Sequence, residues 1–199
     1  MRKRYFLCII FIFIFSSFSG CMNEQSNNQN LITVPLESLS LTLKDLPEGY
    51  SISNIEPSSE EIQGITETEF FGQNFLFTDP LNDTGYPWIG IHLYKFQTTK
   101  DAVDSIQYLS EKQNQTMDES KRNTPLTVEP IGNESIYDLF LNISGTYYKS
   151  TNATFSFIYF RLENVVVYLF LEGIPNNQMD YTLKTIEYAK IIENNISEN

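Results

Sequence analysis

The chain contains very little histidine, cysteine or positive charge. Its 199 residues include 1 His, 2 Cys and 13 Lys and Arg against 25 Asp and Glu, which gives a formal net charge of -12. Nucleic-acid binding draws most of its affinity from basic side chains on phosphates, so this charge balance argues against DNA or RNA as a partner. With one His, most His and Cys metal sites and His-activated nucleophiles are excluded unless His92 supplies them.

The first 20 residues have the pattern of a secretory signal. Basic residues at positions 2–4 precede a run over residues 5–15 that is rich in Ile, Phe and Leu, and small residues follow. This order of a positive, an apolar and a small-residue region is typical of a signal peptide. The apolar run is shorter than the roughly 20 residues that span a bilayer. We therefore expect residues 1–20 to be removed on export.

Cys21 directly follows Phe18, Ser19 and Gly20, and this arrangement is similar to the lipobox at which lipoproteins are cleaved. The resemblance implies that the Cys21 thiol receives a lipid and that the protein stays at the cell membrane, on its extracytoplasmic face. An uncleaved membrane anchor or a secreted form is the alternative. Each of these possibilities leaves the remainder of the chain outside the cytoplasmic membrane.

The mature chain would have no cysteine for a disulfide, because Cys8 leaves with the signal and Cys21 is acylated. Loss of the three basic signal residues leaves ten basic residues against 25 acidic ones, a formal charge of -15. Anionic lipid repels such a chain, so the acyl group must hold it at the membrane. We expect a flexible tether over residues 21–35 and one globular domain over residues 36–199.

Hydrophobic periodicity predicts an α+β domain. Strand patterns cover residues 70–78, 88–96, 135–143, 153–162 and 165–171, and shorter ones cover residues 39–43, 50–55 and 126–131. Helical patterns cover residues 99–115, capped by Thr98 or Thr99, and 180–193, capped by Asn177, and a short helical turn is expected near Ser58. We predict a two-layer sandwich, with a mainly antiparallel sheet of about six strands and both amphipathic helices on one face.

Several of these segments together resemble small surface lipoproteins with a PsbP/Mog1-like domain. The resemblance is carried by residues 43–50, 88–96, 99–102, 131–135 and 160–167, and it covers most of residues 43–195. It implies a binding or assembly accessory. Its motifs are turns and hairpins, so it assigns no catalytic residue to this chain.

Three residues are candidates for ligand contact. His92 shares a predicted strand face with Trp88, and could act as a ligand or base; a structural histidine is the alternative. Tyr86 and Trp88 could form an exposed aromatic platform for a sugar or a protein, or pack in the core. The nearby oxygens of Asp79, Asn82 and Asp83 miss the spacing of a Ca²⁺ loop, so we expect no metal.

Two further features concern the surface. Five glutamates, at positions 56, 60, 61, 67 and 69, form either a docking surface for a basic partner or a solvated acidic face. Six N-glycosylation sequons are present, and in an archaeal source they predict a surface glycoprotein. Their asparagines are Asn82, Asn114, Asn133, Asn142, Asn152 and Asn195.

The sequence lacks the motifs of common enzyme classes, including GxSxG, HExxH, SxxK and a Gly-rich phosphate loop. We therefore expect no catalytic residue, no enzyme activity and no cofactor. The leading hypothesis is a lipid-anchored, non-catalytic binding or assembly module at the cell surface, with an unknown surface protein or small ligand as its partner. The alternative is a small carboxylate-based hydrolase or a sugar-binding domain.

Overall fold

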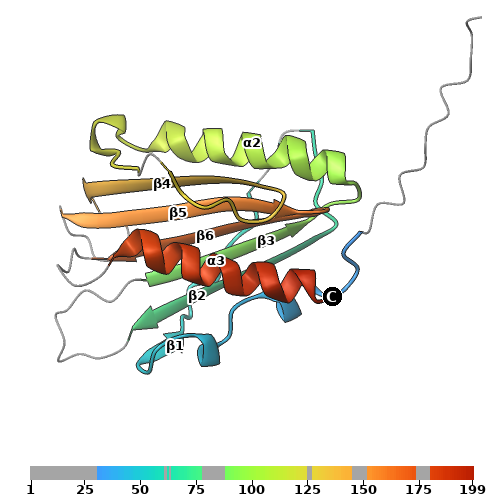
Figure 1. The fold of residues 1–199 in the computed structure, drawn as a ribbon, viewed down its shortest axis with the longest axis horizontal. Helices are drawn as coiled ribbons and strands as arrows, with labels where there is room; N and C mark the ends of the chain where they lie inside the picture. Colours follow the sequence, from blue (N-terminus) through green and yellow to red (C-terminus); the bar gives the residue numbers. More distant parts are fainter. Residues whose placement is uncertain are drawn as a thin grey trace, which may run out of the picture.

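The computed structural model describes residues 31–60, 62, 64–77, 88–124, 127–144, 152–173 and 180–199. Within this part of the chain, six strands form one antiparallel sheet in the order β1-β2-β3-β6-β5-β4 (Figure 1). The α+β class and the antiparallel sheet are thereby confirmed. The strands are β1 (Tyr50–Ile52), β2 (Glu69–Phe77), β3 (Trp88–Lys95), β4 (Glu134–Ile143), β5 (Ala153–Leu162) and β6 (Val165–Gly173).

The two long helices, α2 (Thr99–Thr116) and α3 (Tyr181–Ser197), pack on opposite faces of this sheet. In Figure 1, α3 crosses in front of the sheet and α2 runs above it. Alternate residues of β6 divide between two cores: Val165 and Val167 pack with α3, whereas Val166 packs with α2. Successive residues of a strand point to opposite faces. The expectation that both helices cover one face is therefore wrong.

The physical reason lies in β5 and β6, which are buried along almost their whole lengths. Most of their side chains are apolar on both faces, so neither face of the hairpin can be left in water. A helix on one face alone would leave the other face of the hairpin exposed. Each face has therefore received its own helix.

The predicted strand at residues 39–43 is also wrong. Two 3-10 helices stand there instead, η1 (Leu36–Leu39) and η2 (Leu43–Asp45). The Thr42 amide donates to Asp45 Oδ2 at 2.7 Å, and the Thr42 hydroxyl accepts from the Lys44 amide at 3.3 Å. This capping arrangement starts η2 and stops the segment from extending as a strand. The leucines that alternate in the sequence pack mainly under α3.

The other boundaries differ in detail. The Thr98 cap of α2 is confirmed, because its hydroxyl accepts from the Asp101 amide at 3.1 Å. The cap of α3 is Asp180, whose carboxylate accepts from the Leu183 amide at 3.2 Å; Asn177 lies outside the described residues. The described residues of the segments expected to form a strand at 126–131 and a helical turn at Ser58 have neither structure. A 3-10 turn, η3 (Glu119–Lys121), follows α2.

The turn before β4 packs against the β5–β6 hairpin, and both segments belong to the resemblance noted in the sequence. Gly132 has φ +65°, and a Cβ atom built on it would lie 2.3 Å from the Arg161 carbonyl oxygen. The Asn133 amide donates to that same oxygen at 2.8 Å, and its side-chain oxygen accepts from the Glu163 amide at 2.9 Å. Arg161 in turn forms an ion pair with Glu134 at 2.7 Å. The turn and hairpin motifs of the resemblance therefore join the start of β4 to the β5–β6 turn.

We expect Gly132→Ala to lower the free energy of unfolding by about 2–4 kcal/mol, because the methyl group meets backbone in a left-handed conformation. Gly64 is the matched control, since it also has a positive φ of 76° but has no atom within 4 Å of a built Cβ. Gly64→Ala should cost only about 1 kcal/mol. Urea denaturation of both variants measures the difference, and equal losses would contradict the close contact at Gly132.

Candidate binding and anchoring sites

His92 lies on the α2 side of the sheet, within a group of aromatic rings. Its ring centroid is 5.7 Å from that of Phe70 and 5.6 Å from that of Tyr168, both in edge-to-face contact. The Tyr94 hydroxyl lies 3.5 Å from Nδ1 of His92. His92 is therefore half-buried against aromatic rings, as a structural histidine at the edge of this core would be.

Burial lowers the pKa of His92 to about 4, and the negative charge of Glu60 offsets only part of this effect. The imidazole is therefore neutral at pH 7. A general base usually needs a second group that orients it, and no carboxylate among the described residues is hydrogen-bonded to this ring. These surroundings match those of a structural histidine, which is the alternative to a ligand or a base.

Three tyrosines extend the same group across the α2 face. The rings of Tyr159 and Tyr168 stack at a centroid distance of 4.4 Å, and Tyr94 packs in the same core. Burial raises the pKa of each hydroxyl above its ordinary value of 10, and the charge of Glu60 adds to this shift. All three hydroxyls consequently stay protonated at neutral pH. Glu60 itself forms an ion pair with Lys112 of α2 at 3.0 Å.

The pKa of His92 makes a direct prediction, because the chain has no other histidine. Its imidazole resonances should titrate near pH 4 in the native protein and near 6.5 in urea, as followed by proton NMR. Since the unfolded state binds the proton more tightly, the stabilising preference for neutral His92 is complete above pH 6.5. It is lost as the pH falls from 6.5 towards 4.

We expect this loss to be about 2 kcal/mol, reduced from the full pKa difference by partial solvent exposure. His92→Gln should remove that part of the pH dependence of the unfolding free energy. A native imidazole that titrates near 6.5 would show that His92 is solvated rather than packed.

Trp88 begins β3 and is half-buried, with its ring edge-to-face on Phe170 at 5.1 Å. This contact corresponds to the core-packing alternative for that residue. Tyr86 and the loop oxygens of Asp79, Asn82 and Asp83 lie outside the described residues. In the part of the chain that is described, no group of three or more His, Cys, Asp or Glu side chains is arranged to hold a metal ion.

The acidic cluster before β2 is mostly engaged within the domain. Glu60 pairs with Lys112, Glu67 accepts a hydrogen bond from the Ser59 hydroxyl, and Glu69 pairs with Lys95. Glu56 is exposed, and Glu61 lies outside the described residues. An open hollow of about 540 Å³ lies in this segment, lined by Ser59, Glu60, Ile62, Gly64, Ile65, Thr66 and Glu67.

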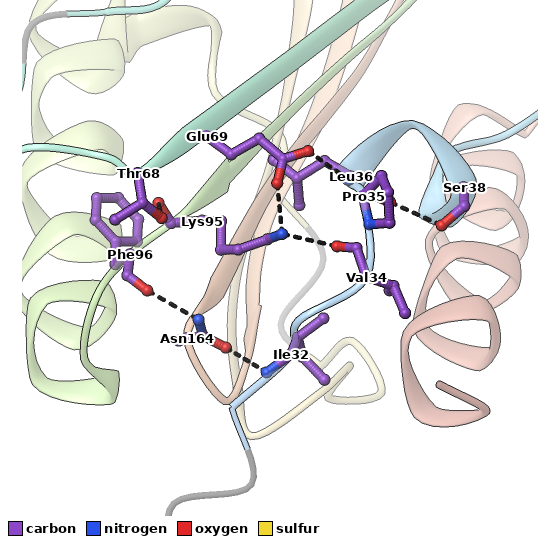
Figure 2. A network of polar contacts seen from close by, with 10 residues as sticks. All are labelled: Ile32, Val34, Pro35, Leu36, Ser38, Thr68, Glu69, Lys95, Phe96 and Asn164. Carbon is purple, nitrogen blue, oxygen red and sulfur yellow. Dashed lines mark hydrogen bonds and ion pairs between the residues drawn. The ribbon is translucent and has the colours of Figure 1, made fainter.

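The segment that enters the domain, residues 32–36, is fastened to the sheet by polar contacts; we call it the strap (Figure 2). The Ile32 amide donates to the Asn164 side-chain oxygen at 2.7 Å, and Asn164 Nδ2 donates to the Phe96 carbonyl at 2.8 Å. The Leu36 amide donates to Glu69 Oε1 at 2.8 Å. The strap is therefore bound at both ends.

Lys95 is the centre of the strap contacts. Only 9% of the residue is exposed, its ammonium donates to the Val34 carbonyl at 2.7 Å, and it forms an ion pair with Glu69. Burial raises the pKa of the Glu69 carboxyl, but the hydrogen bonds from Lys95 and Leu36 and the charge of Lys95 outweigh it. The net pKa lies below the ordinary 4.5. Glu69 is thus held in its charged form.

We expect Lys95→Met to lower the free energy of unfolding by about 1–3 kcal/mol, because it removes the donor to the Val34 carbonyl and the charge that pairs with Glu69. Exchange of the Ile32 and Leu36 amide hydrogens should accelerate at the same time. Since the folded pKa of Glu69 is lowered, its contribution is present above about pH 4.5 and is lost as the pH falls further.

Lys190→Met is the matched control for Lys95→Met. Lys190 also pairs with a glutamate, Glu129, but their side chains are 43% and 68% exposed. Exposed pairs contribute little, so this variant should change stability by less than about 1 kcal/mol. Equal effects of the two variants in urea denaturation would show that the strap contacts add nothing beyond a surface ion pair.

The predicted modification sites differ in their exposure to solvent, and two of them lie outside the described residues. Cys21 and Asn82 lie outside the described residues, whereas Asn133, Asn142 and Asn152 are exposed. Two other sequon asparagines are half-buried and hydrogen-bonded: Asn114 accepts from Arg122 at 2.9 Å, and Asn195 donates to the Leu39 carbonyl at 3.4 Å. Lipidation and glycosylation stay predictions. None of the described helices is long and apolar enough to cross a membrane.

Comparison with known proteins assigns no family to the chain. No family model matches the sequence, and no curated protein matches it. Among solved structures, the extracellular domain of PknH from Mycobacterium tuberculosis is similar in fold to part of this chain. The match covers 69% of this chain and 68% of that one, at 13% identity and a TM-score of 0.45. The resemblance to PsbP/Mog1-like lipoproteins stays a prediction.

Proposed function

We propose that the protein is a non-catalytic binding or assembly module, held by a lipid on Cys21 at the extracytoplasmic face of the cell membrane. The strap is the observation that carries this proposal. It joins the domain directly after the polar run at residues 22–30, and its contacts fix the point at which an anchored tether would pull on the sheet. A tether of that length keeps this point within roughly 20 Å of the lipid surface.

The strap also gives the domain a direction. Lys95 ends β3 and Asn164 joins β5 to β6, so the strap contacts gather at one end of the sheet. Phe77, Trp88 and Gly173 stand at the opposite end, where β2 and β6 finish and β3 begins. In the proposed arrangement, the strap end faces the membrane and the opposite end faces potential partners.

A non-catalytic role is supported by the state of the strongest catalytic candidate. His92 is neutral, is packed among aromatic rings and receives its polar contact from a tyrosine that stays protonated. This arrangement favours a structural histidine over a general base. The contact of Trp88 with Phe170 similarly favours packing over an exposed sugar platform. The hydrolase alternative therefore has no described contact in its favour.

The anchor is tested by replacing each of the two cysteines in turn. Cys21→Ala should abolish incorporation of radiolabelled palmitate and leave the signal uncleaved, because the acylated thiol is gone. Cys8→Ala is the matched control, since Cys8 lies within the signal and should leave labelling unchanged. Label retained in Cys21→Ala would contradict the lipid anchor.

The same strains test the binding part of the proposal. The protein is cross-linked in intact membranes, solubilised in detergent and recovered, with Cys8→Ala as the anchored reference. We expect a specific protein or small ligand to accompany it. Recovery of the anchored protein alone would contradict a binding or assembly role.

A further inference from the structure

The two edges of the sheet are protected differently. The outer side of β4 is covered along part of its length by the segment that follows η3: the Asn123 amide donates to the Leu139 carbonyl at 2.7 Å. The Leu139 amide donates to the Thr124 hydroxyl at 3.1 Å, and Arg122 forms a bridge with Phe140. At the opposite edge, β1 pairs with β2, and no other described strand lies beyond it. The edge that is open to a further strand is therefore β1.

The backbone of β1 offers hydrogen-bonding groups to such a strand. The Ser53 amide, just after β1, donates inward to the Asn74 carbonyl of β2 at 2.9 Å. In an antiparallel pair, the N–H and C=O groups of successive residues point alternately towards and away from the partner strand. Those of Ile52 therefore point outward, where an extended peptide could pair with them.

Exposed apolar side chains gather at this edge. The described residues contain five large apolar side chains that are strongly exposed, and three of them lie on or beside β1. Ile52 is 55% exposed, Ile55 is 47% exposed, and Leu43 of η2, which contacts β1, is 44% exposed. Ile52 stands opposite Phe75, which belongs to the core under α3. An added strand could thus extend that core outward over Ile52.

Charge selects the kind of partner. Glu48 and Glu56 flank β1 in the sequence and are exposed, and no described residue forms an ion pair with either. The mature chain would carry a formal charge of -15, so a second copy of this chain would be repelled from the edge. A basic segment would be attracted. Because β1 is short, backbone pairing supplies few hydrogen bonds, and the apolar and charged contacts must supply the rest.

We propose that the β1 edge binds an extended, basic segment of a partner protein, in which lysine or arginine alternates with apolar residues and which adds to the sheet beside β1. This inference rests on the proposed binding function and names the surface that would perform it. β1 pairs with residues 75–77 of β2, towards the end of the sheet away from the strap. In the anchored arrangement, a partner could therefore reach this edge without meeting the membrane.

The probe is the synthetic peptide Lys-Val-Lys-Ile-Lys-Val-Lys, added to the isotope-labelled mature protein in detergent micelles. NMR should show shift changes confined to β1 and its neighbours, and slower exchange of the Ile52 amide hydrogen. A peptide with glutamate in place of each lysine should bind at least about tenfold more weakly, because it meets like charge. The lysine peptide with alternate backbone nitrogens methylated should also lose binding, because it cannot pair as a strand.

Ile52→Lys should weaken binding of the lysine peptide by about tenfold or more, because it places a positive charge in the apolar contact. Leu183→Lys is the matched control: Leu183 is 67% exposed on α3, away from β1, and its replacement should leave binding unchanged. Both positions are solvent-exposed, so both variants should unfold at the same urea concentration as the wild type.

Each other outcome overturns the proposal. Equal binding of the acidic peptide would show that charge does not select the partner. Equal weakening by Ile52→Lys and Leu183→Lys would place the contact elsewhere. A dimer of the wild-type protein that Ile52→Lys dissociates in analytical ultracentrifugation would make a second copy the occupant. A natural partner recovered from membranes whose binding is insensitive to Ile52→Lys would preserve the binding function and refute this site.

Discussion

The rest of the structure depends on the need to bury the β5–β6 hairpin on both faces. Its two strands have hardly any exposed position, so water must be excluded from each side of the sheet at once. This constraint explains why α2 and α3 lie on opposite faces and why the core under α2 is separate from the core under α3. It also explains the state of His92, which is neutral because it is half-buried against the aromatic rings on the α2 face.

The same constraint determines what is left for contact with other molecules. The two faces are occupied by helices, and one edge is partly covered by the chain that follows η3. Among the described residues, the sheet stays open to a further strand at the β1 edge, and the strap packs at one end of the sheet. A domain of this kind is suited to contact other molecules through the edges of its sheet. Within the described residues, its interior is filled by packed side chains.

Much of this fold could be predicted from the sequence, because long runs of aromatic and β-branched residues favour buried strands. The aromatic and β-branched runs became β2, β3, β5 and β6, and the Thr98 cap fixed the start of α2. The alternating leucines at 39–43 predict a strand, but local capping by Thr42 and Asp45 determines the backbone there. Periodicity shows that a helix has an apolar side, but it does not show which face of a sheet that side covers.

The candidate sites were harder to predict. Asn164 stood in a hairpin turn and Lys95 at the end of an apolar strand, and each position is ordinary by itself. Their role arises only when the fold brings the strap to them: Lys95 contacts a carbonyl 61 residues away, and Asn164 contacts an amide 132 residues away. The one signal in the sequence is a lysine at the end of a run that is mainly apolar and aromatic. The β1 edge was likewise visible only once the strand order was known.

The strand order also has a consequence for the formation of the domain. Strands β1 to β3 form one half of the sheet and β4 to β6 the other, and the halves meet at the pairing of β3 with β6. During synthesis the first half is complete long before its partner strand exists. Until β6 arrives, β3 is a terminal strand with apolar side chains on both faces and with one backbone edge unpaired. The closing step is therefore a long-range contact, which makes slow maturation and early misassociation characteristic hazards of this topology.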